Sequence, residues 1–155
     1  MTDKAEFYAD LTRMAQAITA DEPDLIANLA NISALLNEHL DNINWVGFYL
    51  LQGQTLVLGP FQGKVACVRI AVGQGVCGNA VAANRTLRVA DVHEFDGHIA
   101  CDSASESEIV IPLRLGNDVI GVLDIDAPIK NRFDEADQQG LEALVAMLSQ
   151  SLAGH

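Results

Sequence analysis

The residues of this 155-residue chain that could do chemistry are three cysteines and a group of acids. Cys67, Cys77 and Cys101 are separated by 10 and 24 residues, and their number is odd. Cytosolic thiols are normally kept reduced, and an odd number without a secretion signal argues against a static disulfide framework. Two uses remain for these thiols, namely packing in the core and redox chemistry.

The surroundings of the cysteines differ. Cys67 lies in an apolar segment, residues 65–70, that predicts a strand, where a cysteine usually packs as a small hydrophobic residue. Cys77 lies in a glycine-rich turn. Cys101 lies in a polar loop, where a thiol gains little from packing and is accessible to ligands, so it is the candidate attacking thiol with the others resolving. Because residues 91–108 hold six acids and no Lys or Arg, its thiolate needs help from His98, a hydrogen bond or a cationic substrate.

Two aspartates interrupt an otherwise apolar strand predicted at residues 118–126. Side chains alternate across a strand, so Asp124 and Asp126 share one face and repel each other if both are ionised and desolvated. If the preceding turn takes three residues, Glu108 lies across from Asp126 on that face, whereas a two-residue turn places it on the opposite face. Strand interiors are depleted in Asp, so these acids indicate a ligand site rather than a wet edge.

Clustered carboxylates suit three tasks: holding an ammonium group, donating a proton from a carboxyl with a raised pKa, or binding a divalent metal. The rival zinc site would use the three cysteines with His93 and His98, but neither a Cys-x-x-Cys nor a His-Glu-x-x-His pair occurs. We therefore expect no metal. Trp45, the sole tryptophan, is by default a core residue. If it borders the acids, it would instead hold a methyl or thioether group of a ligand.

Hydrophobic periodicity predicts the elements that must position these residues. Two helices are expected within residues 1–40, the first burying Phe7, Leu11, Met14 and Ile18 and the second beginning at Pro23. A C-terminal helix is expected over residues 134–153, with Asp134 as its N-cap. Six strands are expected at residues 44–51, 55–60, 65–70, 87–90, 107–115 and 118–126.

Two further segments lie between these strands. Glycines open a short helix within residues 73–83, where a Gly-x-Gly-x-x-Gly pattern matches a dinucleotide fingerprint by letters alone, since no parallel βαβ unit surrounds it. Residues 91–106 form a long polar loop, which in a compact domain is usually functional or disordered. Short connections favour antiparallel neighbours, so we predict an α+β fold: one domain over residues 1–155, with helices on a sheet spanning residues 43–126.

The composition argues against several classes of function. Nine Lys and Arg face 21 Asp and Glu, and the arginines are scattered, so a nucleic-acid-binding footprint is disfavoured. No apolar run approaches the ~18–20 residues of a membrane span, and the first residues lack the features of a signal peptide. We therefore expect a cytoplasmic protein that binds neither nucleic acid nor membrane.

Several motifs, taken together, resemble one known family. They are Asn-Trp-Val-Gly-Phe-Tyr-Leu at 44–50, Val-Leu-Asp-Ile-Asp at 122–126, Asn-Arg-Phe-Asp-Glu at 131–135 and the spacing of the cysteines. This combination is similar to the free methionine-R-sulfoxide reductases, which are built on a GAF domain, and the likeness extends over nearly the whole chain. The cysteine spacing is the specific part, since nucleotide-binding GAF modules carry a motif like that at 131–135.

The resemblance implies a reaction. The R-sulfoxide of free methionine is reduced through a cysteine sulfenic acid and an intramolecular disulfide, and a thioredoxin-type dithiol restores the thiols, with no metal or bound organic cofactor. By position, the catalytic nucleophile falls on Cys101, the resolving cysteine on Cys67 and a candidate second resolving cysteine on Cys77.

The resemblance also implies a substrate site and an assembly. The acids of the site fall on Glu108, Asp124 and Asp126, and its aromatic wall on Trp45 with Tyr49 beside it. A homodimer is expected, for which the N-terminal helices offer a surface. The alternative is a non-catalytic GAF sensor that binds a small ligand in the same pocket.

Overall fold

A six-stranded antiparallel sheet organises the chain, in the order β3-β2-β1-β6-β5-β4. The computed structural model describes residues 3–97 and 104–154. The strands are β1 (Trp45–Gln52), β2 (Thr55–Gly63), β3 (Arg69–Ala71), β4 (Leu87–Val89), β5 (Ser107–Leu115) and β6 (Asp118–Ala127). The helices are α1 (Lys4–Thr19), α2 (Leu25–His39), α3 (Gly75–Ala83), the short 3-10 helix η1 (Val92–Glu94) and α4 (Glu135–Ala153). The prediction of an α+β fold with an antiparallel sheet is confirmed.

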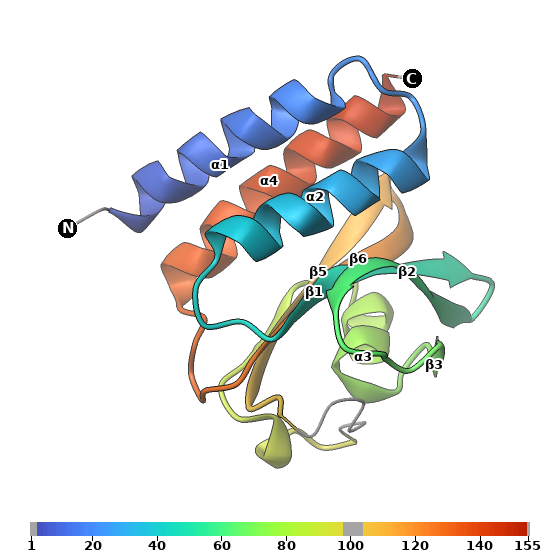
Figure 1. The fold of residues 1–155 in the computed structure, drawn as a ribbon. Helices are drawn as coiled ribbons and strands as arrows, with labels where there is room; N and C mark the ends of the chain where they lie inside the picture. Colours follow the sequence, from blue (N-terminus) through green and yellow to red (C-terminus); the bar gives the residue numbers. More distant parts are fainter. Residues whose placement is uncertain (1–2, 98–103, 155) are drawn as a thin grey trace.

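The two faces of the sheet carry different layers. Helices α1, α2 and α4 cover one face, and α3 packs on the other (Figure 1). Side chains alternate along the central strands, so Phe48, Ile109 and Leu123 enter the core between the sheet and α1, α2 and α4. The residues between them enter a second cluster under α3, which includes Trp45, Tyr49, Val110, Val122, Cys77 and Ala80.

The N-terminal helices differ from the prediction in their faces and ends. Helix α1 buries Tyr8, Leu11 and Ala15, while Met14 and Ile18 are exposed, so the predicted stripe was wrong at two positions. The cause lies in α4: a Cβ at Gly140 would stand 2.2 Å from Tyr8 Cγ, so the missing side chain of Gly140 makes room for the Tyr8 ring. Helix α2 begins at Leu25 after its N-cap Asp24, two residues later than predicted.

The strand predicted at residues 65–70 is also shorter, because β3 begins at Arg69. Trp45 Nε1 donates to the carbonyl of Lys64 at 3.1 Å, and Tyr49 Oη donates to the carbonyl of Cys67 at 2.8 Å. These carbonyls are bonded by side chains rather than by a neighbouring strand, so Cys67 lies in a connection and not in a strand. Within the described ranges, no helix is long and apolar enough to cross a bilayer.

Candidate active site

Three strands bring the predicted acids onto the face that α3 covers. Asp126 of β6 pairs with Trp45 of β1 on one side and with Glu108 of β5 on the other. Asp124, two residues earlier, pairs with Gly47 and Val110 and therefore points to the same face. The predicted grouping of Glu108, Asp124 and Asp126 is confirmed as geometry.

The register that produces this grouping arises differently from the prediction. The turn between β5 and β6 takes two residues, Gly116 and Asn117, because Leu115 pairs with Asp118. A bulge follows, since Arg114 pairs with Val119 whereas Leu113 pairs with Gly121. The extra residue restores the offset that a three-residue turn would have produced, and so returns Glu108 to the face of the aspartates.

Two of the three acids, Glu108 and Asp124, are buried without a neutralising cation among the described residues. Glu108 is 7% exposed and Asp124 5% exposed, and neither forms an ion pair within residues 3–97 and 104–154. Burial, and next to it the charge of Asp124, raises the pKa of Glu108 well above its usual value. Burial and the charge of Asp126 likewise raise the pKa of Asp124.

Asp124 also has an unsatisfied oxygen. Its Oδ1 is buried and has no hydrogen-bond partner among the described residues. A buried carboxylate oxygen without a donor is costly, and native structures rarely leave one unless a ligand supplies the partner. The acids are therefore arranged to receive a hydrogen-bond donor, and an ammonium group is the donor that matches their charge.

Cys77 contacts the acid group from α3. Gly73 and Gly75 before it have positive φ angles, and Gly78 after it lies so close to β3 that a Cβ there would stand 2.3 Å from the carbonyl oxygen of Ala71. Cys77 Sγ lies 4.0 Å from Glu108 Oε2, and burial together with Asp124 and Glu108 raises the pKa of its thiol. Donor atoms of Cys77, Glu108 and Asp124 lie within 4.8 Å of one another, close enough to hold a divalent cation.

Aromatic rings form a wall beside the acids. The Trp45 ring stacks on Phe61 at 5.1 Å and on Tyr49 at 5.9 Å between centroids. Trp45 and Tyr49 are both buried. Burial, reinforced by Asp124, raises the pKa of Tyr49, so its hydroxyl stays protonated as a donor to the Cys67 carbonyl. Trp45 and Tyr49 were the aromatic residues expected here, and Phe61 of β2, which was not expected, completes the stack.

The cysteines fall into distinct environments. Cys67 is half-buried and disulfide-bonded, whereas Cys77 keeps a free, buried thiol. The predicted nucleophile Cys101 and its candidate helper His98 lie outside the described residues. His93, a rival zinc ligand by sequence, instead has its Nδ1 2.9 Å from Asp91 Oδ1 and 3.5 Å from Glu106 Oε2.

Comparisons with known proteins agree with this geometry. Residues 24–152 match the GAF domain family. The chain is 62% identical over 151 residues to the free methionine-R-sulfoxide reductase of Escherichia coli, covering 97% of this chain and 92% of that protein. It is 57% identical to the solved fRMsr of Staphylococcus aureus in its reduced form, with a TM-score of 0.92 and coverage of 94% and 95%.

A further solved structure was obtained with a ligand. The free methionine-R-sulfoxide reductase of Neisseria meningitidis, in complex with its substrate, has a TM-score of 0.93 and 45% identity, covering 98% of this chain and 92% of that one. This chain belongs to the free methionine-R-sulfoxide reductase family. The family resemblance and the GAF fold predicted from the motifs are thereby confirmed.

The Asn-Arg-Phe-Asp-Glu motif has a structural role in this chain. Asn131 adopts a left-handed conformation (φ 54°), and its N–H donates to the Ala90 carbonyl at 2.7 Å. The N–H of Arg132 donates to Ser107 Oγ, which in turn donates to the Ile129 carbonyl. In this reductase-family chain the motif thus anchors the start of β5, one residue before Glu108.

Proposed function

We propose that this protein reduces the R-sulfoxide of free methionine to methionine, using a thioredoxin-type dithiol as reductant. The observation that carries the proposal is the burial of Glu108 and Asp124 beside the Trp45 wall, with no ion pair among the described residues, in a chain of this family. The ammonium of the free amino acid supplies the missing positive charge and the missing donor for Asp124. A methionine residue inside a protein has no such ammonium, so the site discriminates against it.

The aromatic wall and the acids divide the substrate between them. Trp45 shelters the S-methyl group, because sulfur and its methyl groups make favourable contacts with aromatic rings. Glu108 is suited to protonate the sulfoxide oxygen, because burial and the charge of Asp124 favour the protonated form of its carboxyl. Asp126, at the half-buried end of the group, helps to hold the ammonium.

The proposed chemistry passes through three thiol steps. Cys101 attacks the sulfoxide sulfur while a carboxyl protonates the oxygen, so that methionine leaves and Cys101 becomes a sulfenic acid. Cys67 then condenses with the sulfenic acid, releasing water and forming a disulfide. The external dithiol reduces this disulfide and is itself oxidised. That Cys67 is disulfide-bonded and Cys77 is not supports Cys67 as the resolving cysteine.

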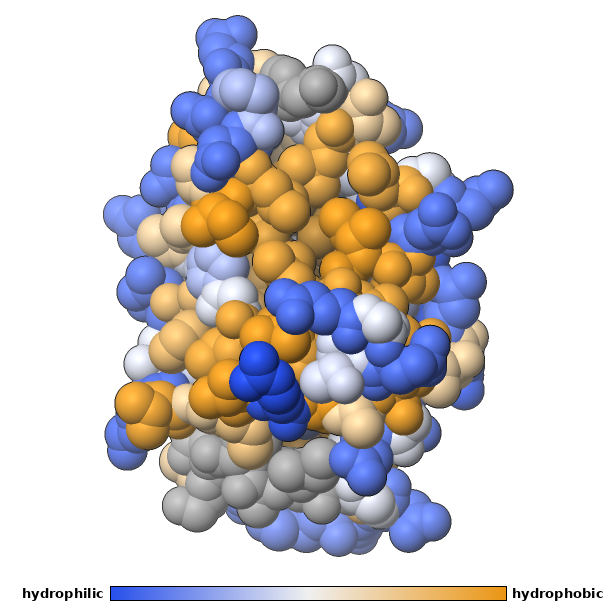
Figure 2. All heavy atoms as spheres, turned by 90° about the vertical axis from the view of Figure 1, so that its right-hand side faces the viewer, coloured by the Kyte–Doolittle hydropathy of each residue, from blue (hydrophilic) through white to orange (hydrophobic). Residues whose placement is uncertain are grey.

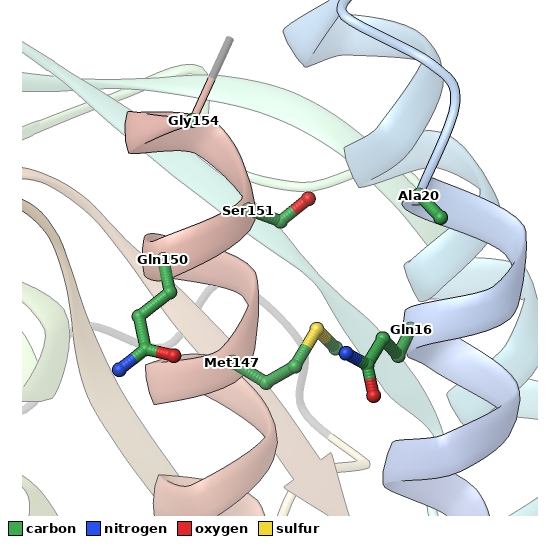
Figure 3. Close-up of a pocket in the computed structure, with 6 residues that line it drawn as sticks. All are labelled: Gln16, Ala20, Met147, Gln150, Ser151 and Gly154. Carbon is green, nitrogen blue, oxygen red and sulfur yellow. The ribbon is translucent and has the colours of Figure 1, made fainter.

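We propose a homodimer formed through the N-terminal helices. Met14 and Ile18 of α1 are exposed. At the end of α1, Gln16 and Met147 of α4 point toward each other across a groove (Figure 3). A second copy would cover the apolar side chains of Met14, Ile18 and Met147. Sedimentation should show a dimer that Ile18→Glu weakens; a monomeric wild-type protein would contradict this assembly.

The cytoplasm is the proposed compartment, because the cycle needs a reducing dithiol pool. No metal or organic cofactor takes part in the proposed reaction, so protein treated with a chelator should keep its full activity. Loss of activity on chelation, restored by a divalent metal, would overturn this.

The decisive experiment follows NADPH in the presence of thioredoxin and thioredoxin reductase. Mixed R and S sulfoxides of free methionine should support oxidation that stops when half of the sulfoxide is spent. Absence of turnover, with retained binding of a small ligand, would favour the non-catalytic sensor. Cys101→Ser should abolish methionine formation even in a single turnover, whereas Cys67→Ser should still form one equivalent; a full single turnover by Cys101→Ser would refute the assigned nucleophile.

A further inference from the structure

The charge of this acidic chain is unevenly distributed. Residues 42–90 contain none of the 21 Asp and Glu residues, yet they hold four of the nine Lys and Arg, namely Lys64, Arg69, Arg85 and Arg88. This stretch builds β1, β2, β3, α3 and β4. Lys64 and Arg69 flank the β2–β3 connection, whereas Arg85 and Arg88 lie beside or within β4 at the opposite edge of the sheet. The connection that holds Cys67 is therefore bordered by two cations, with no acid near them in the sequence.

That connection exposes apolar side chains next to Cys67. Val65 is 90% exposed and Val68 54% exposed, on either side of the half-buried cysteine. Lys64 and Arg69, both exposed, flank them. On the side of the molecule where β2 and β3 lie, hydrophobic side chains gather over a broad area (Figure 2). Two exposed valines beside a disulfide-bonded cysteine indicate a contact surface, because clustered exposed apolar side chains mark sites of protein–protein interaction.

The connection is held firmly although its side chains are exposed. Three of its carbonyls accept hydrogen bonds from the sheet: Lys64 from Trp45, Cys67 from Tyr49, and Val68 from the Leu58 N–H at 2.9 Å. The N–H groups of Val65 and Ala66 donate none of the hydrogen bonds found among the described residues. A partner can therefore pair with backbone donors that are already in place, at a low cost in conformational entropy.

We propose that the protein dithiol reductant docks on residues 64–69 and attacks Cys67 Sγ. The inference rests on the proposed function and adds the place and direction of the reductive step. The reductant thiolate bonds to Cys67 Sγ, and the sulfur disulfide-bonded to Cys67 leaves as a thiolate. The second thiol of the reductant then attacks the reductant's first sulfur, which is now bonded to Cys67 Sγ. The Cys67 thiolate leaves, and the reductant ends as a disulfide. Val65 and Val68 contact the apolar surface around the reductant's thiol, and Lys64 and Arg69 favour an acidic rim around it.

A pair of substitutions tests the docking surface. Val65→Glu should lower the ratio of kcat/KM for thioredoxin to kcat/KM for dithiothreitol at least tenfold, because the small reductant needs no docking surface. Leu115→Glu, at an exposed apolar residue that ends β5, is the matched control and should leave the ratio within twofold. An unchanged ratio in Val65→Glu would overturn the proposal, whereas loss of wild-type activity with both reductants would count against the proposed function instead.

The direction of attack is tested by trapping. Thioredoxin that lacks its second active-site thiol should form a stable mixed disulfide with the oxidised protein. Trypsin separates the three cysteines, since cleavage after Lys64, Arg69, Arg85, Arg88 and Arg114 places them on peptides 65–69, 70–85 and 89–114. Thioredoxin bonded to peptide 65–69 supports attack at Cys67, and bonding to peptide 89–114 overturns it.

Discussion

Buried carboxylates occur on both sides of the sheet, and their surroundings are opposite. Asp137, at the start of α4, is fully surrounded by donors: Tyr8 Oη at 2.6 Å, Lys4 Nζ at 2.8 Å, the Asp134 N–H at 2.9 Å and Arg132 Nη1 at 3.5 Å. Across the sheet, Glu108 and Asp124 have comparable burial but no ion pair within the described ranges.

The difference separates a structural acid from a binding acid. A buried charge whose donors are all present holds elements together, and Asp137 joins α1, α4 and the loop before α4. A buried acid with an unpaired oxygen lowers stability until a ligand provides the partner. Among the described residues no cation pairs with Glu108 or Asp124, and this leaves room for a substrate ammonium. Four predictions test this contrast.

The largest expected effect is on activity at the unpaired group. Asp124→Asn keeps the shape of the side chain but loses the charge for the ammonium, so kcat/KM for free methionine-R-sulfoxide should fall about 100-fold or more, equivalent to roughly 3 kcal/mol. The free energy of unfolding of the ligand-free protein should rise, because a buried repulsive charge is removed. Urea unfolding and steady-state kinetics measure both; a variant that is less stable yet fully active would reverse the assignment.

The next effect is on stability at the paired group. Asp137→Asn leaves Lys4, Arg132 and Tyr8 without their common acceptor, so the free energy of unfolding should fall by about 3 kcal/mol. Asp134→Asn is the matched control, because Asn caps a helix as well as Asp and only an exposed ion pair with Lys4 is lost. It should cost less than about 1 kcal/mol; equal losses at the two positions would remove the contrast.

The two regions also give opposite dependences on pH. Glu108 and Asp124 have raised pKa values, so the folded protein binds more protons than the unfolded chain and stability falls as pH rises above about 4.5. The N–H of Asp137 and the Lys4 ammonium lower the pKa of Asp134 to about 2, so its contribution is present above pH 3.8 and is lost as pH falls toward 2. Urea midpoints from pH 4 to 8 should decline less steeply in Asp124→Asn than in the wild type.

The smallest effects come from two hydroxyl groups, one in each region. Tyr8→Phe removes a donor to a charged carboxylate and should cost about 2 kcal/mol of stability. Tyr49→Phe removes a donor to the Cys67 carbonyl and should cost about 1 kcal/mol. Thermal unfolding compares them directly. A larger loss for Tyr49→Phe would mean that the site face is held as firmly as the Asp137 network.

Local pattern was enough to predict part of the site. Alternation in a strand places Asp124 and Asp126 on one face whatever the partner strands are, and the N-cap at Asp134 depends on residues three positions apart. The motifs that carried the family resemblance are likewise short and contiguous, which is why the sequence alone was enough to predict the reaction class.

Other features depend on contacts between distant parts of the chain. A bulge beside Arg114, rather than the length of the turn, returns Glu108 to the aspartates. The Gly140 gap in α4 sets which face α1 buries, and hydrogen bonds from Trp45 and Tyr49 remove Cys67 from β3. Cys77 reaches the acids only because α3 packs over them.

The division has a physical basis. Periodicity, capping and motif spacing act within a few residues, so the linear sequence specifies the elements, the paired aspartates and the family. Burial, register and the presence or absence of a counter-charge depend on which elements meet in space. Packing therefore determined that Asp137 is neutralised by the protein and that Glu108 and Asp124 are left for a ligand.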